Sequence, residues 1–381
     1  MRGGCRGGPP MPDKNGISDM KKLYNVRFGG GTKTISMEGD RVAAIEGAAG
    51  APAPGDIDGG GLLAVPGLVD IHAHGCLGLD TMDGDFAEMA VFRAKNGTTT
   101  WLPTTMTAFR EDLERVCAAP RDVPGARLPG IHLEGPHIAL SRKGAQNAAC
   151  IRPPDIEELR ALRPAAVRVT VAPELPGALE YIRAAADMGV SVTVGHTDAT
   201  YEQACAAFDA GATSLTHTFN AMPGLHHRKP GPIGAAVAKG AYGELICDGL
   251  HVAPAMVLLA WKAFGTDRLA LVSDNIRPAG APDGTYDSGG LEVFLKNGEA
   301  RLADGTLAGC SITLWECVRR AVSFGIPFAD AIRMATATPA AAARLDAGYI
   351  APGGPADILL VDDSGALPEL RGVILRGERF A

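Results

Sequence analysis

The sequence is poor in the features that mark secreted, membrane-bound and nucleic-acid-binding proteins. Its eight cysteines form no C-x-x-C pair and no dense framework, so we interpret them as reduced thiols of a cytoplasmic protein. No stretch reaches about 18 apolar residues, and the N-terminus lacks the apolar core of a secretory signal, which argues against membrane spanning and export. A formal net charge of -7 argues against a broad electrostatic grip on nucleic acid or anionic lipid.

The composition that remains is that of a large globular protein. Hydrophobic residues make up 46% and charged residues 21%, which supplies enough apolar surface for a sizeable core. The 381 residues, at roughly 150 per domain, predict one large domain with a smaller companion. Because folding signals begin at Lys21, we expect residues 1–20 to form a disordered tail or to precede a working initiator at Met20.

Between residues 67 and 275, short apolar or β-branched runs alternate with helix-period segments, several of which are closed by glycine. This alternation is typical of βα units around a parallel sheet. Eight runs can be counted, at residues 68–73, 98–105, 130–135, 167–172, 191–196, 214–219, 244–249 and 269–274. They predict an α/β protein with a (β/α)8 TIM barrel.

The two ends of the chain have a different texture, with short strand-like segments and glycine-rich turns. We expect residues 21–66 and 347–381 to pair into one small β-sandwich domain built from both chain ends. Residues 67–346 would then form the barrel domain.

All nine histidines lie between positions 72 and 251, several near the C-terminal ends of predicted strands, where TIM-barrel enzymes build their active sites. His72 and His74 end the first strand and, at i and i+2, point to the same side. They form either a metal half-site or an ordinary pair of polar residues. Glu134, His196 and His217 end the third, fifth and sixth strands, and together they have the composition of a catalytic zinc site with a position left for water.

Asp274 ends the eighth strand. Alone it would be a cap for the following turn, but beside a bound metal it would accept a proton from water and pass it to a leaving group. Cys76 and Cys247 lie near the expected barrel mouth without a spaced cysteine partner, so we interpret them as buried fillers.

A second polar set follows the sixth and seventh strands. An arginine can hold phosphate oxygens with two parallel hydrogen bonds, so this set indicates either a grip on an anionic substrate group or exposed loop charge. Its members are Asn220, His226, His227, Arg228 and His251.

From about residue 22 to the end, the chain resembles the N-acetylglucosamine-6-phosphate deacetylases of the amidohydrolase superfamily. Seven segments in the same order carry the resemblance: PGLVDIHAHG, HLEGPH followed by RKGAQN, GHTDAT, HTFNAMPGLHHRKPG, DGLH, LVSDN, and MATATPAAAARL with GYIAPGGPADILLVD.

The resemblance implies a divalent metal, with zinc expected first and iron or another ion as alternatives. One ion would be bound by Glu134, His196 and His217. A second site at His72 and His74 would share Glu134, and whether one or both sites fill is left open. The catalytic aspartate falls on Asp274. Substrate contacts carry over to Ala145, Asn220, Ala221, Arg228, His251 and Leu307.

Arg228 and His251 would grip the phosphate. Since the arginine can come from a neighbouring subunit in family members, the resemblance also implies a homodimer. Three departures from the family pattern lie near the expected sugar: His137, Gln146 and Asn275 stand where an aromatic residue, a histidine and an alanine are common. None removes a metal ligand or Asp274, but they leave the sugar preference open.

The expected reaction is hydrolysis of the acetamide of N-acetylglucosamine 6-phosphate to glucosamine 6-phosphate and acetate, in amino-sugar catabolism. The nearest alternative substrate is the 6-phosphate of N-acetylgalactosamine. A further alternative is an amidohydrolase acting on an unphosphorylated amide, which would need no phosphate grip. A non-catalytic sugar-phosphate sensor is disfavoured because the ligand set and Asp274 are complete.

Overall fold

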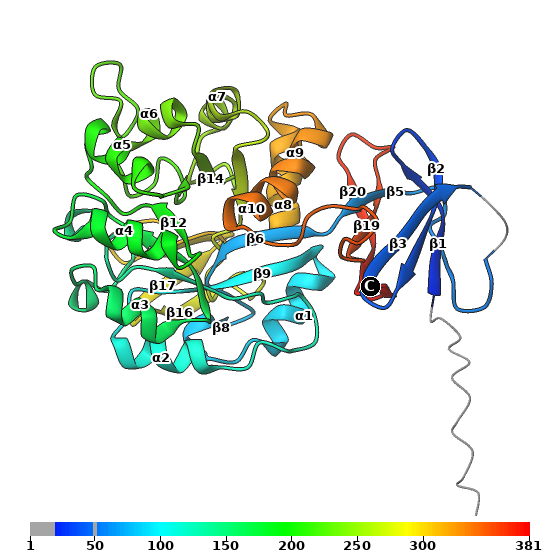
Figure 1. Ribbon diagram of the computed structural model, residues 1–381, viewed down its shortest axis with the longest axis horizontal. Helices are drawn as coiled ribbons and strands as arrows, with labels where there is room; N and C mark the ends of the chain where they lie inside the picture. The colour runs from blue at the N-terminus through cyan, green and yellow to red at the C-terminus, as the bar shows by residue number, and fades with distance from the viewer. Residues whose placement is uncertain (1–19, 49–51) are drawn as a thin grey trace, which may run out of the picture.

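The computed structural model describes residues 20–48 and 52–381, which form a barrel with a smaller β unit at one side (Figure 1). The predicted N-terminal tail lies outside the described residues except for Met20, which begins the first strand. None of the helices within the described ranges combines the length and the apolar character that crossing a membrane requires.

Each of the eight predicted runs overlaps one strand of a single parallel sheet, in the order β15-β14-β13-β12-β11-β10-β9-β6. The backbone N–H of Asp274 donates to the carbonyl of His72 over 2.9 Å, which joins the last strand to the first. The predicted TIM barrel is therefore confirmed. The strands are β6 (Leu68–Ala73), β9 (Thr98–Thr105), β10 (Ile131–Glu134), β11 (Ala166–Val171), β12 (Ser191–Val194), β13 (Ser214–Leu215), β14 (Tyr242–Ile246) and β15 (Leu269–Val272).

Helices cover the outside of the barrel, so both faces of its strands are buried and the strands read as nearly continuous apolar runs. Local signals set the helix ends. At the start of α5, the side chain of Thr200 accepts from the N–H of Gln203, whose side chain accepts from the N–H of Thr200. The helices are α1 (Ala87–Lys95), α2 (Arg110–Ala118), α3 (Ile156–Leu162), α4 (Ala178–Asp187), α5 (Tyr201–Asp209), α6 (Gly231–Lys239), α7 (Pro254–Phe264), α8 (Leu314–Ser323), α9 (Phe328–Met334) and α10 (Ala337–Ala343).

The last of these helices, α10, closes the N-terminal end of the barrel. The hydroxyl of Ser191 donates to the carbonyl of Ala342 over 2.9 Å, and the alanines of α10 share a buried cluster with Val69 and Ile71 of β6. With α10 packed at this end, the opposite end, at the C-terminal ends of the strands, is the one that contains a ligand-sized cavity.

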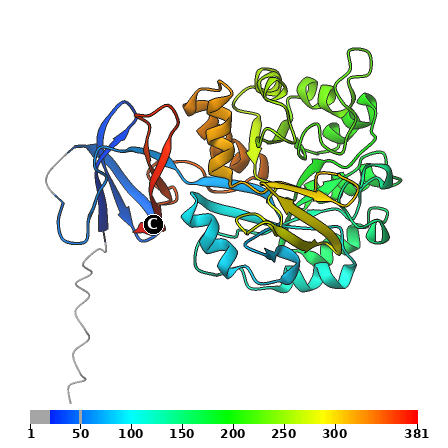
Figure 2. The same cartoon turned by 180° about the vertical axis from the view of Figure 1, so that it is seen from behind.

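The small β unit takes strands from both ends of the chain, as expected (Figure 2). Its strand order is β21-β20-β19-β5-β1-β2-β3, with β4 paired to β1. Leu23, Ile35, Ile358 and Ile374 belong to a core that is separate from that of the barrel. The strands are β1 (Met20–Phe28), β2 (Gly31–Glu38), β3 (Arg41–Gly47), β4 (Ile57–Asp58), β5 (Leu63–Pro66), β19 (Ile358–Asp362), β20 (Glu369–Leu375) and β21 (Glu378–Arg379).

A hairpin and a small three-stranded sheet lie in the loops at the C-terminal side of the barrel. The hairpin β7 (Gly75–Cys76) and β8 (Leu79–Asp80) follows the first barrel strand. A three-stranded sheet of β16 (Gly284–Ser288), β17 (Leu291–Lys296) and β18 (Glu299–Leu302) follows the eighth. Ile276, Val293 and Ala308 form the core of this sheet, and Ala145 packs against it.

Arg127 joins the barrel to the small β unit. Its guanidinium donates to Asp357 over 2.7 and 3.3 Å and to Asp40 over 2.8 Å. The Asp357 side chain is 5% exposed and that of Asp40 is 47% exposed, so the Asp357 bonds carry most of the stabilisation.

We expect Arg127→Ala to lower the free energy of unfolding by about 1.5–3 kcal/mol, the contribution of hydrogen bonds between charged groups that are partly shielded from water. Arg41→Ala is the matched control, since Arg41 pairs with Asp346 at the surface, where both side chains are about half exposed; its effect should stay below about 1 kcal/mol. Urea unfolding of the two variants measures the difference, and equal stabilities would contradict a joining role for Arg127.

Candidate active site

A cavity of about 370 Å³ opens at the C-terminal ends of the barrel strands. Its walls come from the ends of seven of the eight barrel strands and the loops that follow them, and from the segment after β18. Among the residues selected from sequence, those that line it are His74, Glu134, Ala145, His196, His217, Asn220, Ala221, His251, Asp274 and Leu307. His72 lies beneath the floor and is fully buried.

Glu134, His196 and His217 meet at the floor of this cavity. Glu134 Oε1 lies 3.1 Å from His196 Nε2 and 3.0 Å from His217 Nε2, and the two ring nitrogens are 3.1 Å apart. One carboxylate oxygen and two imidazole nitrogens therefore converge on one point, as in a metal site.

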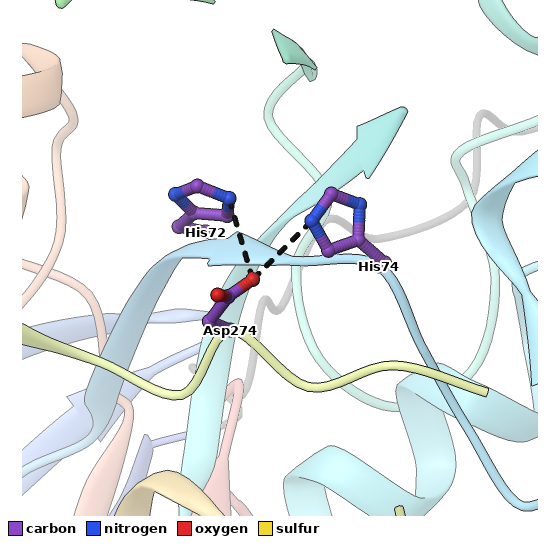
Figure 3. Close-up of side chains that lie close together, drawn as sticks. All are labelled: His72, His74 and Asp274. Atoms are coloured by element: carbon purple, nitrogen blue, oxygen red, sulfur yellow. Dashed lines mark ion pairs between the residues drawn. The ribbon is translucent and has the colours of Figure 1, made fainter. Parts of the chain in front are cut away.

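His72, His74 and Asp274 form a second group next to the first. Figure 3 shows the rings of His72, on β6, and of His74, directly after it, with Asp274 facing both. Asp274 Oδ1 lies 3.5 Å from His72 Nε2 and 3.3 Å from His74 Nε2. Glu134 connects the groups, because its Oε1 is 3.2 Å from His72 Nε2 and its Oε2 is 3.3 Å from His74 Nε2.

Hydrogen bonds on the far side of the rings show that the cluster fits a cation. The Nδ1–H groups of His74 and His196 donate to the carbonyls of Thr104 and Arg142, over 3.1 and 2.8 Å. A neutral imidazole with its proton on Nδ1 has a lone pair on Nε2, and these lone pairs point at the carboxylates. Lone pairs facing carboxylate oxygens repel unless a cation lies between them, so the residues suit a divalent metal.

The electrostatics of the cluster favour carboxylates in the charged form. Burial raises the pKa of Asp274, but the charges of His72 and His74 outweigh this effect and bring the pKa below its ordinary value. Burial lowers the pKa of His74, yet hydrogen bonds to Asp274 and Glu134 raise it to about 9. Protons and a metal compete for the same atoms here, so metal binding releases protons.

Three of these residues have a left-handed backbone conformation, which was not expected. The φ angles are 47° at His196, 26° at His217 and 47° at Asp274. The predicted runs place these residues in the strands, whereas β12, β13 and β15 each end two residues earlier. Such conformations cost of order 1–3 kcal/mol each in a non-glycine residue and persist where surrounding contacts hold them.

Sequence reasoning placed Gln146 near the sugar but missed its contact with Glu134, and it missed Asp248 altogether. The side chain of Gln146 donates to Glu134 Oε2 and accepts from the N–H of Thr107 over 2.7 Å, so it fixes the bridging carboxylate. Asp248 Oδ2 lies 2.6 Å from His251 Nδ1. The DGLH motif contains Asp248, and its spacing of three residues from His251 is the signal that would have found it.

The structure separates the residues of the second polar set, which are Asn220, His226, His227, Arg228 and His251. Asn220 and His251 line the cavity, whereas Arg228 is exposed on a loop and bonds to His227 over 2.8 Å. The cavity wall of this chain instead contains the arginine Arg142, which pairs with Asp198. Cys76 and Cys247 are fully buried, as expected for fillers.

A TIM barrel whose open end carries two groups able to hold a divalent metal has the architecture of a metal-dependent barrel hydrolase. A family model described as the amidohydrolase family matches residues 63–378. The chain belongs to the amidohydrolase family.

Relatives and a solved structure support this assignment. The chain is 39% identical over 316 residues to N-acetylgalactosamine-6-phosphate deacetylase of Escherichia coli O157:H7, covering 79% of this chain and 84% of the relative. It is 39% identical over 276 residues to N-acetylglucosamine-6-phosphate deacetylase of Bacillus subtilis, covering 68% of this chain and 70% of the relative. A variant of the Mycobacterium smegmatis N-acetyl-D-glucosamine-6-phosphate deacetylase, solved in complex with N-acetyl-D-glucosamine-6-phosphate, superposes with a TM-score of 0.85 at 34% identity, covering 95% of this chain and 98% of that one.

Proposed function

We propose that this protein hydrolyses the acetamide of N-acetylglucosamine 6-phosphate, releasing acetate and glucosamine 6-phosphate in amino-sugar catabolism. The observation that carries the proposal is the pair of ligand groups joined by Glu134 on the floor of a sugar-sized cavity, with Asp274 beside them. Relatives with deacetylase names over most of the chain support the choice of substrate class.

The residues of the cavity supply the proton transfers. A divalent metal held by the two ligand groups would polarise the acetyl carbonyl and lower the pKa of water. Asp274 accepts the proton of the attacking water as its oxygen bonds to the carbonyl carbon. It then donates that proton to the nitrogen as the C–N bond breaks, leaving the free amine and acetate. Zinc suits the N/O donor set, with iron as an alternative.

The phosphate end of the substrate is assigned to His251 and Arg228. His251 lines the cavity of its own chain, whereas Arg228 lies on an exposed loop, so we propose that Arg228 reaches the cavity of a second copy in a homodimer. We also propose that the protein works in the cytoplasm, which agrees with free thiols at all seven cysteines in the described ranges.

Arg228→Ala should lower kcat/KM for a phosphorylated sugar by about 10- to 100-fold, because charge-assisted hydrogen bonds to the phosphate are lost. Turnover of the unphosphorylated sugar should not change. Arg183→Ala, at an exposed arginine on α4, is the control and should match the wild type.

Mixing Arg228→Ala and Asp274→Asn chains should restore part of the activity if the arginine crosses between subunits. Absence of recovery in mixed oligomers would contradict that arrangement.

Recognition of the phosphate should weaken as the pH rises. Burial lowers the pKa of His251 and Arg301 lowers it further, but the hydrogen bond and charge of Asp248, helped by Asp274, raise it above its ordinary value. The imidazolium charge is present below the raised pKa and lost above it. We expect kcat/KM for the phosphorylated sugar to fall as the pH passes through that pKa, and Asp248→Asn to move the fall to lower pH. A pH profile with the unphosphorylated sugar should lack this fall, and identical profiles for both sugars would contradict the role of His251.

A second substrate, N-acetylgalactosamine 6-phosphate, is favoured by one specific observation: the relative from Escherichia coli O157:H7, also 39% identical, is a deacetylase of that sugar. The two sugars differ in the orientation of one hydroxyl group. Both the amide nitrogen and the amide oxygen of Gln146 bond to protein, so this side chain does not distinguish the two sugars.

Acetate release tests the proposal, measured with metal content on the same purified sample. The substrates are N-acetylglucosamine with and without the 6-phosphate, and both forms of the galacto epimer. A much higher kcat/KM for the phosphorylated sugars than for the unphosphorylated ones is the expected result, and the faster epimer identifies the substrate. Absence of turnover in metal-loaded protein would refute the deacetylase assignment and favour an amidohydrolase of an unphosphorylated amide.

A further inference from the structure

An ion pair lies inside the barrel beneath the active-site floor, and neither of its residues lines the cavity. Arg168 on β11 donates to Glu244 Oε1 on β14 over 2.6 Å, and both side chains are at most 1% exposed. Arg168 also donates to the hydroxyls of Ser191 and Ser214, over 2.6 and 2.8 Å. The sequence around Glu244, ELICDG, resembles an ordinary strand start, so the ion pair was not predicted from the sequence.

The other oxygen of Glu244 faces the metal-ligand cluster. Oε2 lies 2.9 Å from His72 Nδ1 and accepts from the backbone N–H of His217 over 3.2 Å. One carboxylate therefore contacts a residue of each ligand group. On the far side of its ring, His72 Nε2 is buried and has no hydrogen-bond partner among the described residues, and it points at Glu134 and Asp274.

Stability alone does not account for this pair. Removing two charges from water costs more than their attraction commonly returns, so well-packed apolar residues at the same positions would hold the barrel at least as well. Arginine has no acceptor, so Arg168 can face Glu244 only as a donor and holds Oε1 toward itself. This leaves Oε2 to receive a proton from His72.

We propose that Glu244, held by Arg168, is the positioning residue that makes His72 a metal ligand and so allows the His72, His74 and Asp274 group to bind a second ion. Donation from Nδ1 to Glu244 fixes the proton on that nitrogen and leaves the Nε2 lone pair facing the cluster. The inference rests on the metal-binding part of the proposed function and is independent of the sugar.

Glu244→Gln tests this directly, because the amide must orient in one way. Its oxygen faces the donors of Arg168, so its NH2 group faces His72 Nδ1 and moves the ring proton to Nε2. We expect zinc content to fall from two ions per chain to one, or the weaker ion to bind about 10- to 100-fold less tightly in competition with a chelator. His72→Ala should show the same loss, and adding Glu244→Gln to it should cause no further loss.

Two further variants separate positioning from folding. Ser214→Ala removes a hydrogen bond from Arg168 without touching Glu244, and it should keep both ions. The double variant R168M/E244L removes the pair without leaving a buried charge, so its metal-free form should melt near the wild-type temperature while the protein binds only one ion. Two ions at wild-type affinity in Glu244→Gln or in the double variant would overturn the inference. A wild type with one ion would overturn it while leaving the hydrolysis proposal standing, whereas a wild type that binds no zinc would overturn both.

Discussion

Asp274→Asn is expected to lower kcat by about 10²- to 10⁴-fold, the usual contribution of a general acid and base in direct contact with the reacting atoms. The asparagine side chain has nearly the same shape but cannot carry a proton from water to the leaving nitrogen. Because substrate contacts remain, KM should change little, and the ion at Glu134, His196 and His217 should be retained.

Steady-state kinetics and metal content on one sample check this result. Asp267→Asn is the matched control, since Asp267 is an exposed carboxylate whose side chain is 73% exposed and pairs with Arg333 outside the cavity. It should have wild-type kcat. An Asp274→Asn protein with kcat near that of Asp267→Asn would exclude Asp274 as the proton carrier.

Glu134→Gln should remove more activity than any change to a supporting residue, because this single carboxylate approaches ligands of both groups. An amide is a weaker, uncharged ligand, so metal content should fall at both sites. The loss in metal affinity should exceed the 10- to 100-fold that is typical when a residue behind a ligand is changed.

Gln146→Leu is expected to weaken metal binding less than Glu134→Gln does. It leaves the charge of Glu134 in place but removes the donor to Oε2, so its metal affinity should fall between those of the wild type and Glu134→Gln. Chelator competition with each purified protein measures the order. A Glu134→Gln protein that keeps two tightly bound ions would contradict the bridging role.

The sequence predicted the barrel because each strand is buried on both faces and therefore forms a short apolar run. It also selected the candidate ligand residues that the structure brings together, because the strand ends of a parallel barrel meet at one face and the period of two directs His72 and His74 to the same side. These are consequences of local geometry repeated around a closed sheet.

Other features arise from contacts between distant segments and had no local signal. Arg168 and Glu244 are 76 positions apart and meet across the barrel interior. The left-handed turns at His196, His217 and Asp274 follow from tertiary contacts, since histidine and aspartate also occur in ordinary strands. The separation of Arg228 from His251 depends on how one loop leaves the barrel, which residue type alone does not determine.

The pairing of β5 with β19 has a consequence for synthesis of the chain on the ribosome. β5 ends at Pro66 and its partner begins at Ile358, so the whole barrel is translated between them. At roughly 5–20 residues per second, about 290 residues take roughly 15–60 s, during which the edge of β5 has open backbone donors and acceptors. An open edge of this kind is a template for pairing with other nascent chains. This edge of β5 is therefore paired only once the C-terminal strands have been made.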